Sequence, residues 1–295
     1  MQEKELQLTG GSLHYEIRPR NVCVTGWNGL AGEVTVPEKI EGLPVTIIGK
    51  KAFLSKKNLR RVFLPDTVEQ IEDWAFAYCD SLTQVELPCR EIRFGRSVFL
   101  ECGELKSLAV QGKGRSVAAL LAAAVTTAEA YYLLHVTEAG SEEWLERWDA
   151  RMLTVLGTAD QEGYSKQVLC GEEDYGSTDL AAYMSGRRKV KVRLLLLRLL
   201  YSDCLKPQIR EKAQVYLQSH TKGCESEETW QVLLGEHGDD REYYELFAEL
   251  GCLTEDNLDA LLQDIGEDHP EMKAFFLRYK GEKIGYNDFF EELEL

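Results

Sequence analysis

The chain has 295 residues, of which 44% are hydrophobic and 28% charged, a balance that is typical of globular domains and excludes a disordered chain. Its charge is uneven, because residues 1–115 hold 16 basic and 15 acidic side chains whereas the remainder holds 18 and 35. The acidic second part would repel nucleic-acid phosphates and anionic lipid surfaces, so we expect neither nucleic acid nor a membrane as a partner.

The cellular location is inferred from the ends of the chain, its apolar runs and its cysteines. The first residues lack an apolar core, so no signal peptide is expected. Residues 117–136 hold a single formal charge, at Glu129, but they are rich in alanine and predict a buried helix rather than a membrane span. Eight cysteines are scattered without a C-x-x-C pair, which indicates free thiols in a reducing compartment. We therefore expect a cytoplasmic protein.

A repeat of 23 residues occupies positions 48–110. Each copy has an Ile-Gly-x-x-Ala-Phe-like part followed by a Leu-x-x-Val-x-Leu part, at 48–53 and 59–64, 71–76 and 82–87, and 94–99 and 105–110. An incomplete copy begins at Val34, and residues 41–45 form an insertion. The alternating part predicts a strand with one buried face, and the Ala-Phe part predicts a short helical turn. One unit cannot bury its own apolar side, so the copies are expected to stack.

Two cysteines keep step with this repeat. Cys79 and Cys102 lie 23 residues apart, and Lys56 occupies the same place in the first copy. A small core residue is the favoured interpretation. A zinc or redox site is the alternative, although no second pair of ligands is near in the sequence.

The repeat resembles the BspA-type (Treponema pallidum-like) bacterial leucine-rich repeats, which share the pattern Ile-Gly-x-x-Ala-Phe…Cys-x-x-Leu-x-x-Val-x-Leu-Pro. The resemblance covers about residues 13–110, and the sequence departs from it at Phe94, at Lys56 and at the missing proline after Val110. It implies a short right-handed leucine-rich repeat β-solenoid over residues 1–113. It also implies an interaction module, because members of the family are typically interaction modules, many of them at cell surfaces.

The second domain, residues 114–295, is expected to be acidic and all-helical. Apolar spacing of three and four predicts helices at 144–152, 243–250, 258–265 and 272–279. Ser116, Ser141 and Thr254 are expected N-caps, and Gly251, Gly266 and Gly281 are expected stops. The last two helices resemble an ankyrin-like hairpin. The fold class is therefore α+β with two domains, a leucine-rich repeat solenoid followed by an all-α helix-pair domain.

Three polar segments contain residue types that can bind phosphate or metal ions. Gly112-x-Gly114 has Val117 where a dinucleotide loop requires its third glycine, so nucleotide binding is not expected. Residues 160–179 lack the spacing of a calcium loop and predict an acidic surface loop. The basic run at 187–193 fits either a phosphate patch or a helix that pairs with carboxylates, and the acidic surroundings favour the second.

No catalytic pattern is present. The five histidines form no H-E-x-x-H motif, and no G-x-S-x-G elbow occurs. Residues 237–240, His-Gly-Asp-Asp, are metal-capable in type but predict a turn between helices. Adjacent carboxylates splay apart on a helix and do not form an acid–base pair. We therefore expect a protein that is not an enzyme and that has no metal and no cofactor.

Side chains between the core anchors of each strand are expected to point to solvent, where repeat proteins usually bind. The predicted partner-binding residues are Arg61, Phe63, Gln84 and Glu86, because an aromatic ring beside an arginine is typical of binding hot spots. The alternative is that Phe63 is covered by the N-terminal segment or by the helical domain. A cluster of basic side chains on the turns could instead dock on the acidic half: Lys50, Lys51, Lys56, Lys57 and Arg60.

The sequence thus predicts a non-catalytic protein–protein interaction module with an unidentified protein partner, and it favours a monomer. Two alternatives stay open. One is an adhesin-like protein at the cell surface, which the family resemblance allows. The other is an enzyme or small-ligand binder with its site in the crevice between the domains, which a large apolar pocket with converging polar groups would favour.

Overall fold

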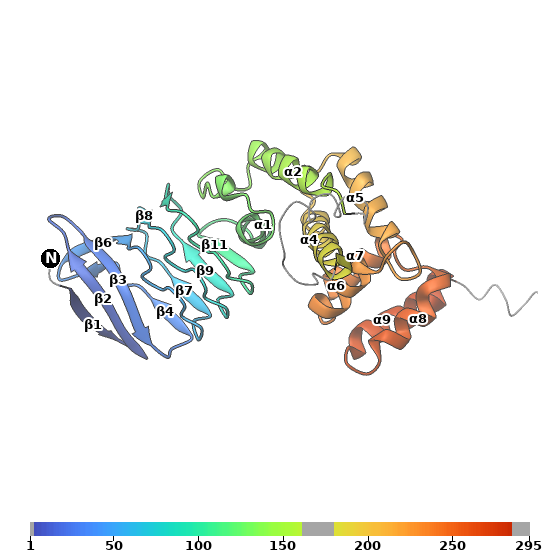
Figure 1. The fold of residues 1–295 in the computed structure, drawn as a ribbon, viewed down its shortest axis with the longest axis horizontal. Helices are drawn as coiled ribbons and strands as arrows, with labels where there is room; N and C mark the ends of the chain where they lie inside the picture. Colours follow the sequence, from blue (N-terminus) through green and yellow to red (C-terminus); the bar gives the residue numbers. More distant parts are fainter. Residues whose placement is uncertain (1–2, 161–179, 285–295) are drawn as a thin grey trace, which may run out of the picture. The chain divides into compact units, whose positions relative to one another are not determined.

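The computed structural model describes residues 3–160 and 180–284, and within them strands precede helices (Figure 1). The chain folds into two compact units, Met1–Arg151 and Met152–Leu295. The predicted α+β class, a solenoid followed by helices, is confirmed. Strands give way to helices just after the expected domain boundary at 113, whereas the first compact unit continues to Arg151 because the first helices pack on the solenoid.

One sheet runs from the N-terminus into the repeats. β1, β2 and β3 are antiparallel, and β3 then pairs in parallel with β6. From there β6, β8 and β10 form a parallel ladder, so the first anchor of each repeat lies in a strand of its own. This sheet comprises β1 (Lys4–Leu8), β2 (Gly11–Ile17), β3 (Val22–Gly29), β5 (Lys39–Ile40), β6 (Leu43–Ile48), β8 (Gln70–Ile71) and β10 (Arg93–Phe94).

A second sheet consists of the four predicted repeat strands, all parallel, in the order β11-β9-β7-β4. They are β4 (Glu33–Thr35), β7 (Arg61–Phe63), β9 (Gln84–Leu87) and β11 (Ser107–Val110). Arg61 is the register partner of Gln84, and Gln84 is the partner of Ser107. These registers reproduce the 23-residue repeat. Glu33 pairs with Arg61 across a longer interval because the insertion at 41–45 lies between them.

The turns that join the two sheets differ from the prediction. The Ala-Phe motif forms hydrogen-bonded turns rather than the expected helical turn, because its amides alternate between two kinds of partner. Ala52 and Leu54 donate three residues back along their own chain, to the carbonyls of Gly49 and Lys51 at 3.2 and 3.1 Å. The amides of Lys51, Phe53 and Ser55 donate to the carbonyls of residues 73, 75 and 77 at 2.7 to 3.1 Å. Left-handed backbone recurs at equivalent sites of each copy: Lys51 and Ser55, Trp74 and Tyr78, Ser97 and Glu101. We call this third side of the solenoid the turn column.

The core of the solenoid is stacked in the same step. The rings of Phe53, Phe76 and Phe99 lie nearly parallel, with successive centroids 5.0 and 5.5 Å apart. The thiols of Cys79 and Cys102 are buried and lie 3.0 and 3.1 Å from the carbonyl oxygens of Phe53 and Phe76. Burial raises the pKa of Cys79 to about 11 and that of Cys102 to about 12. The two cysteines are protonated core residues, as predicted.

Helices close the last repeat. α1 (Arg115–Thr126) lies beside β11 (Figure 1), and it is followed by a 3-10 turn (Tyr131–Leu133) and α2 (Glu142–Leu156). Trp148 donates its indole N–H to the carbonyl of Leu120 at 3.1 Å, and Trp144 donates to Leu133 at 2.9 Å. Residues 115–151, here called the cap, therefore bury the open end of the ladder. The expected N-cap at Ser116 is wrong, because α1 begins at Arg115 with Gly114 before it.

The alanine-rich run at 117–136 is part of this buried cap. Within residues 3–160 and 180–284, no helix has both the length and the apolar character that crossing a bilayer requires. Lys113 holds the cap to the end of the solenoid by donating to the carbonyls of Thr137 and Ala139 at 3.1 and 2.6 Å.

The second unit is helical where it is described. Its helices are α4 (Leu180–Leu200), α5 (Pro207–Ser219), α6 (Glu228–His237), α7 (Arg241–Glu249), α8 (Glu255–Ile265) and α9 (Pro270–Tyr279). Thr254 and Asn257 form a reciprocal capping box on α8. Trp230, Phe247 and Phe276 pack ring against ring in the core. The expected stop at Gly281 is wrong, because the backbone continues from α9 as a π-helix, Lys280–Ile284.

Candidate functional site

The outward side of the second sheet brings the predicted binding residues together. Val62, Val85 and Leu108 point inward and are fully buried, so the residues on either side of them point outward. Two rows cross the four strands, Glu33-Arg61-Gln84-Ser107 and Thr35-Phe63-Glu86-Ala109. We call these eight residues the ladder face. Arg61 and Gln84 are neighbours in the first row, and Phe63 and Glu86 are neighbours in the second.

The charges of the ladder face are only partly compensated. The Arg61 guanidinium forms an ion pair with the Glu33 carboxylate across β4 and β7. Both side chains are about half exposed, so the pair contributes little stability, roughly 0–1 kcal/mol. Glu86 is half-buried, and its carboxylate makes no ion pair with any residue in the described ranges. The half-buried ring of Phe63 lies beside it. The face therefore combines an apolar ring with an uncompensated carboxylate.

The basic cluster of the turn column is partly engaged within the first unit. The ammonium groups of Lys50 and Lys51 lie 5.1 and 5.6 Å from the centre of the Trp74 ring, within the range of a cation–π contact. Lys57 pairs with Asp80 at 3.3 Å. Docking of this cluster on the acidic half stays a prediction.

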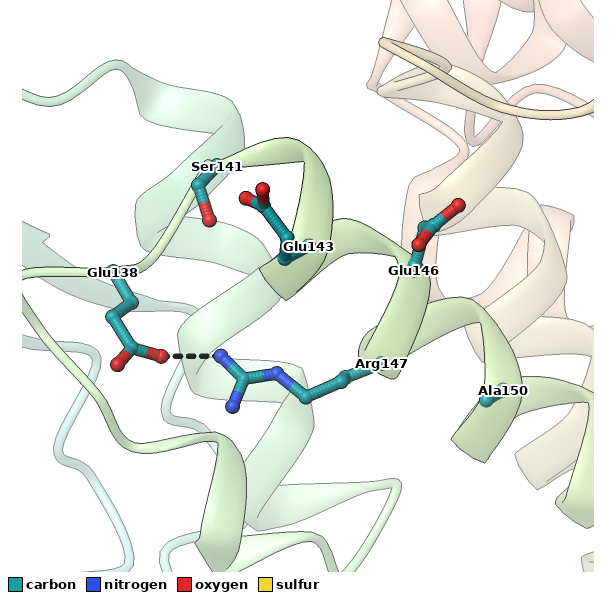
Figure 2. Close-up of a pocket in the computed structure, with 6 residues that line it drawn as sticks. All are labelled: Glu138, Ser141, Glu143, Glu146, Arg147 and Ala150. Carbon is teal, nitrogen blue, oxygen red and sulfur yellow. Dashed lines mark hydrogen bonds and ion pairs between the residues drawn. The ribbon is translucent and has the colours of Figure 1, made fainter.

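A hollow of about 630 Å³ lies against α2 and is lined by Glu138, Ser141, Glu143, Glu146, Arg147 and Ala150. Figure 2 shows Arg147 reaching from α2 to the carboxylate of Glu138, while Glu143 and Glu146 point away from this pair. The hydrogen bond from Arg147 lowers the pKa of Glu138. The hollow is open to solvent and is lined mainly by charged residues, whereas a typical small-ligand pocket is enclosed by hydrophobic and aromatic side chains.

The basic run at 187–193 lies on α4 and pairs with carboxylates of the second unit, as favoured. Arg188 contacts Glu228 at 2.8 Å, and Arg193 contacts Glu236 at 2.6 Å. Lys191 is buried, at 2% side-chain exposure, and pairs with Asp160 at 2.8 Å. These contacts give the run a structural role within its own domain.

The Asp160 cluster is the polar feature that sequence reasoning missed. Tyr216 donates its hydroxyl to the Asp160 carboxylate at 2.7 Å and stacks on His220 at 4.0 Å. Burial opposes ionisation of Asp160, but hydrogen bonds from Lys191 and Tyr216 outweigh it and lower its pKa. One signal in the sequence could have indicated this cluster. Lys191 lies three and four residues before Leu194 and Leu195, so it shares the buried side of α4 with them and needs an acidic partner there.

The metal-capable residues at 237–240 form the predicted turn. His237 contacts Asp240 at 3.0 Å, and His269 contacts Asp239 at 2.9 Å. No group of three or more histidine, cysteine, aspartate or glutamate side chains converges as metal ligands within residues 3–160 and 180–284. The predicted acidic loop at 160–179 lies, from residue 161 onward, outside the described residues.

Comparison with known proteins gives a family for the solenoid. Residues 33–120 match the BspA type leucine rich repeat region, in six copies. Similar solved structures include the leucine-rich repeat protein of Treponema pallidum, at 31% identity over 35% of this chain and 48% of that chain, with a TM-score of 0.32. A leucine-rich repeat protein from Bacteroides capillosus is 30% identical over 35% of this chain and 78% of that chain, with a TM-score of 0.31.

A leucine rich cell surface protein from Faecalibacterium prausnitzii is 24% identical over 36% of this chain and 31% of that chain, with a TM-score of 0.31. The chain thus spans about half the length of the Treponema protein and about a third of the Faecalibacterium one. No protein with a curated description matches the chain. The family match covers the repeats found in the sequence, and residues 33–120 form a BspA-type leucine-rich repeat region.

Proposed function

We propose that this chain is a non-catalytic protein–protein interaction module that binds a protein partner through the ladder face, with Arg61, Phe63, Gln84 and Glu86 as its central contacts. The observation that carries the proposal is the register of β7 and β9, which places these four side chains side by side on one outward surface. The repeat family supports it, because leucine-rich repeats indicate a role in protein interaction or at a surface.

The construction of the solenoid supports binding rather than chemistry. Backbone ladders connect successive repeats in both sheets and in the turn column, so the ladder face is rigid before a partner arrives. A preorganised surface loses little conformational entropy on binding. The face is the outward side of a four-stranded parallel sheet, and a sheet surface suits a macromolecule better than a small substrate, which usually binds in a concave pocket.

The test compares the wild type with two folded double variants in a pulldown from source-cell lysate. R61E/F63D alters the ladder face. R93E/Y78D makes matched changes elsewhere on the solenoid, at the exposed Arg93 of β10 and the exposed Tyr78 of the turn column. We expect one protein to be retained by the wild type and by R93E/Y78D and to be lost with R61E/F63D. Equal recovery by all three would reject the ladder face as the binding surface.

We further propose a reducing compartment, the cytoplasm, as the site of action. Among the described residues the cysteines are free thiols, at positions 23, 79, 89, 102, 204, 224 and 252. A cell-surface position is the second candidate, and the repeat family favours it. Alkylation of the protein in intact source cells, followed by mass spectrometry, separates the two. Free thiols throughout support the cytoplasm, and disulfide-linked cysteines contradict it.

A further inference from the structure

We propose that Phe63 and Glu86 form a subsite for an arginine side chain of the protein partner. This inference rests on the proposed function and makes it specific, because it names the chemistry that the ladder face recognises. It concerns two residues on neighbouring strands rather than the whole surface.

The geometry comes from the parallel register. Phe63 on β7 and Glu86 on β9 are direct partners, and neighbouring strands lie about 4.8 Å apart. Both residues flank inward-facing core positions, so their side chains leave the same side of the sheet. The side chains of Phe63 and Glu86 therefore extend from paired positions on the same side of the sheet, so that one guanidinium group can reach both.

The charges identify the ligand as a cation. Arg61 is compensated by Glu33, whereas Glu86 makes no ion pair with any residue of the described segments. The half-burial of Glu86 and Phe63 reduces solvent screening of a charge placed there. A positive group from a partner would meet the unpaired carboxylate of Glu86. The neighbouring Arg61 would repel this group only weakly, because Glu33 compensates the charge of Arg61.

The aromatic ring favours arginine over lysine. A guanidinium group is planar, so it stacks on a ring and still donates in-plane hydrogen bonds to a carboxylate. An ammonium group is compact and more strongly hydrated. The flanking residues in this row are Thr35 and Ala109. Both are small, so they leave space on either side of the pair for the stem of an incoming side chain.

The first test uses N-acetyl-arginine amide as the probe, titrated into the isotopically labelled full-length chain and followed by NMR. We expect chemical-shift changes centred on Phe63 and Glu86. We expect Glu86→Gln to weaken binding by about tenfold and Phe63→Leu to weaken it severalfold. Glu91→Gln is the matched control, because Glu91 is exposed and lies outside the ladder face, and it should bind like the wild type.

Three outcomes would overturn the inference. In the first, the wild type and Glu86→Gln bind N-acetyl-arginine amide equally well. In the other two, the wild type binds the uncharged N-acetyl-citrulline amide, or N-acetyl-lysine amide, as tightly as it binds N-acetyl-arginine amide. The pulldown then separates this failure from failure of the proposed function. A partner that is lost with R61E/F63D but retained by Glu86→Gln would support the binding face and reject the arginine subsite. Loss of the partner with Glu86→Gln but not with Glu91→Gln would support both.

Discussion

Replacement of Phe76 by leucine tests whether stacking between repeats stabilises the solenoid. Phe76 is fully buried and is the middle ring of three, with neighbours at 5.0 and 5.5 Å. Leucine keeps most of the apolar volume but removes both ring–ring contacts. The matched control is Phe99→Leu, because Phe99 is also buried but stacks on Phe76 alone among the described aromatic rings.

The magnitude follows from the number of ring contacts. An aromatic pair contributes about 0.5–1.5 kcal/mol beyond the area it buries. Phe76→Leu should therefore lower the free energy of unfolding by roughly 1–3 kcal/mol from stacking, and Phe99→Leu by about half as much. Loss of volume adds a similar further cost in both variants, so the difference between them isolates one ring pair.

Hydrogen exchange of the full-length chain, read by mass spectrometry on peptides that cover β7 and β9, measures this stability without requiring the units to unfold together. We expect the protection of these strands to fall further in Phe76→Leu than in Phe99→Leu, by the equivalent of about 0.5–1.5 kcal/mol. Equal losses in the two variants would refute the stacking argument and leave only volume.

Three further predictions concern the thiols and the buried ion pair. The thiols of Cys79 and Cys102 should resist alkylation at pH 8 in the native protein, because burial raises their pKa to about 11 and about 12; labelling as fast as in the urea-unfolded chain would contradict this. Lys191→Ala should lower stability by up to about 3–5 kcal/mol, since it removes the ion pair of Asp160 and leaves that carboxylate with the hydrogen bond from Tyr216; a loss below 1 kcal/mol in urea unfolding would reject a stabilising pair. The pKa of Asp160 lies below its ordinary 3.8, so its contribution is present above that pH and is lost as the pH falls further; Asp160→Asn should flatten the pH dependence of unfolding below about pH 4, and an unchanged slope would contradict the assignment.

Much of the solenoid could be predicted because its information is periodic. A constant step of 23 residues defines both which strands pair and in what register, and alternation along each strand separates buried from outward side chains. The turn column could not be predicted in the same way. Lysine, serine, tryptophan, tyrosine and glutamate occupy its left-handed positions, and none of these residue types signals that conformation. The stacking of successive repeats imposes the left-handed conformation.

The candidate site was predictable in position but not in its interactions. Alternation places Arg61 and Phe63 outward, and the structure agrees. The ion pair between Arg61 and Glu33 depends on the register of β4 with β7, across the insertion at 41–45. Sequence period alone does not give that register. The sequence predicts a buried helix at 117–136 but leaves its partner open for a related reason, because the alanine-rich α1 is apolar on most sides and its composition does not specify which element it covers.

Site-specific photo-crosslinking tests the central claim most directly. A photoreactive phenylalanine analogue replaces Gln84, in the middle of the ladder face, or Arg93, which is exposed on β10 of the other sheet, and the protein is irradiated in source-cell lysate. We predict one discrete crosslinked protein from position 84, displaced by excess unlabelled wild type but not by R61E/F63D, and no such product from position 93. The same product from both positions, or none from position 84, would contradict recognition through the ladder face.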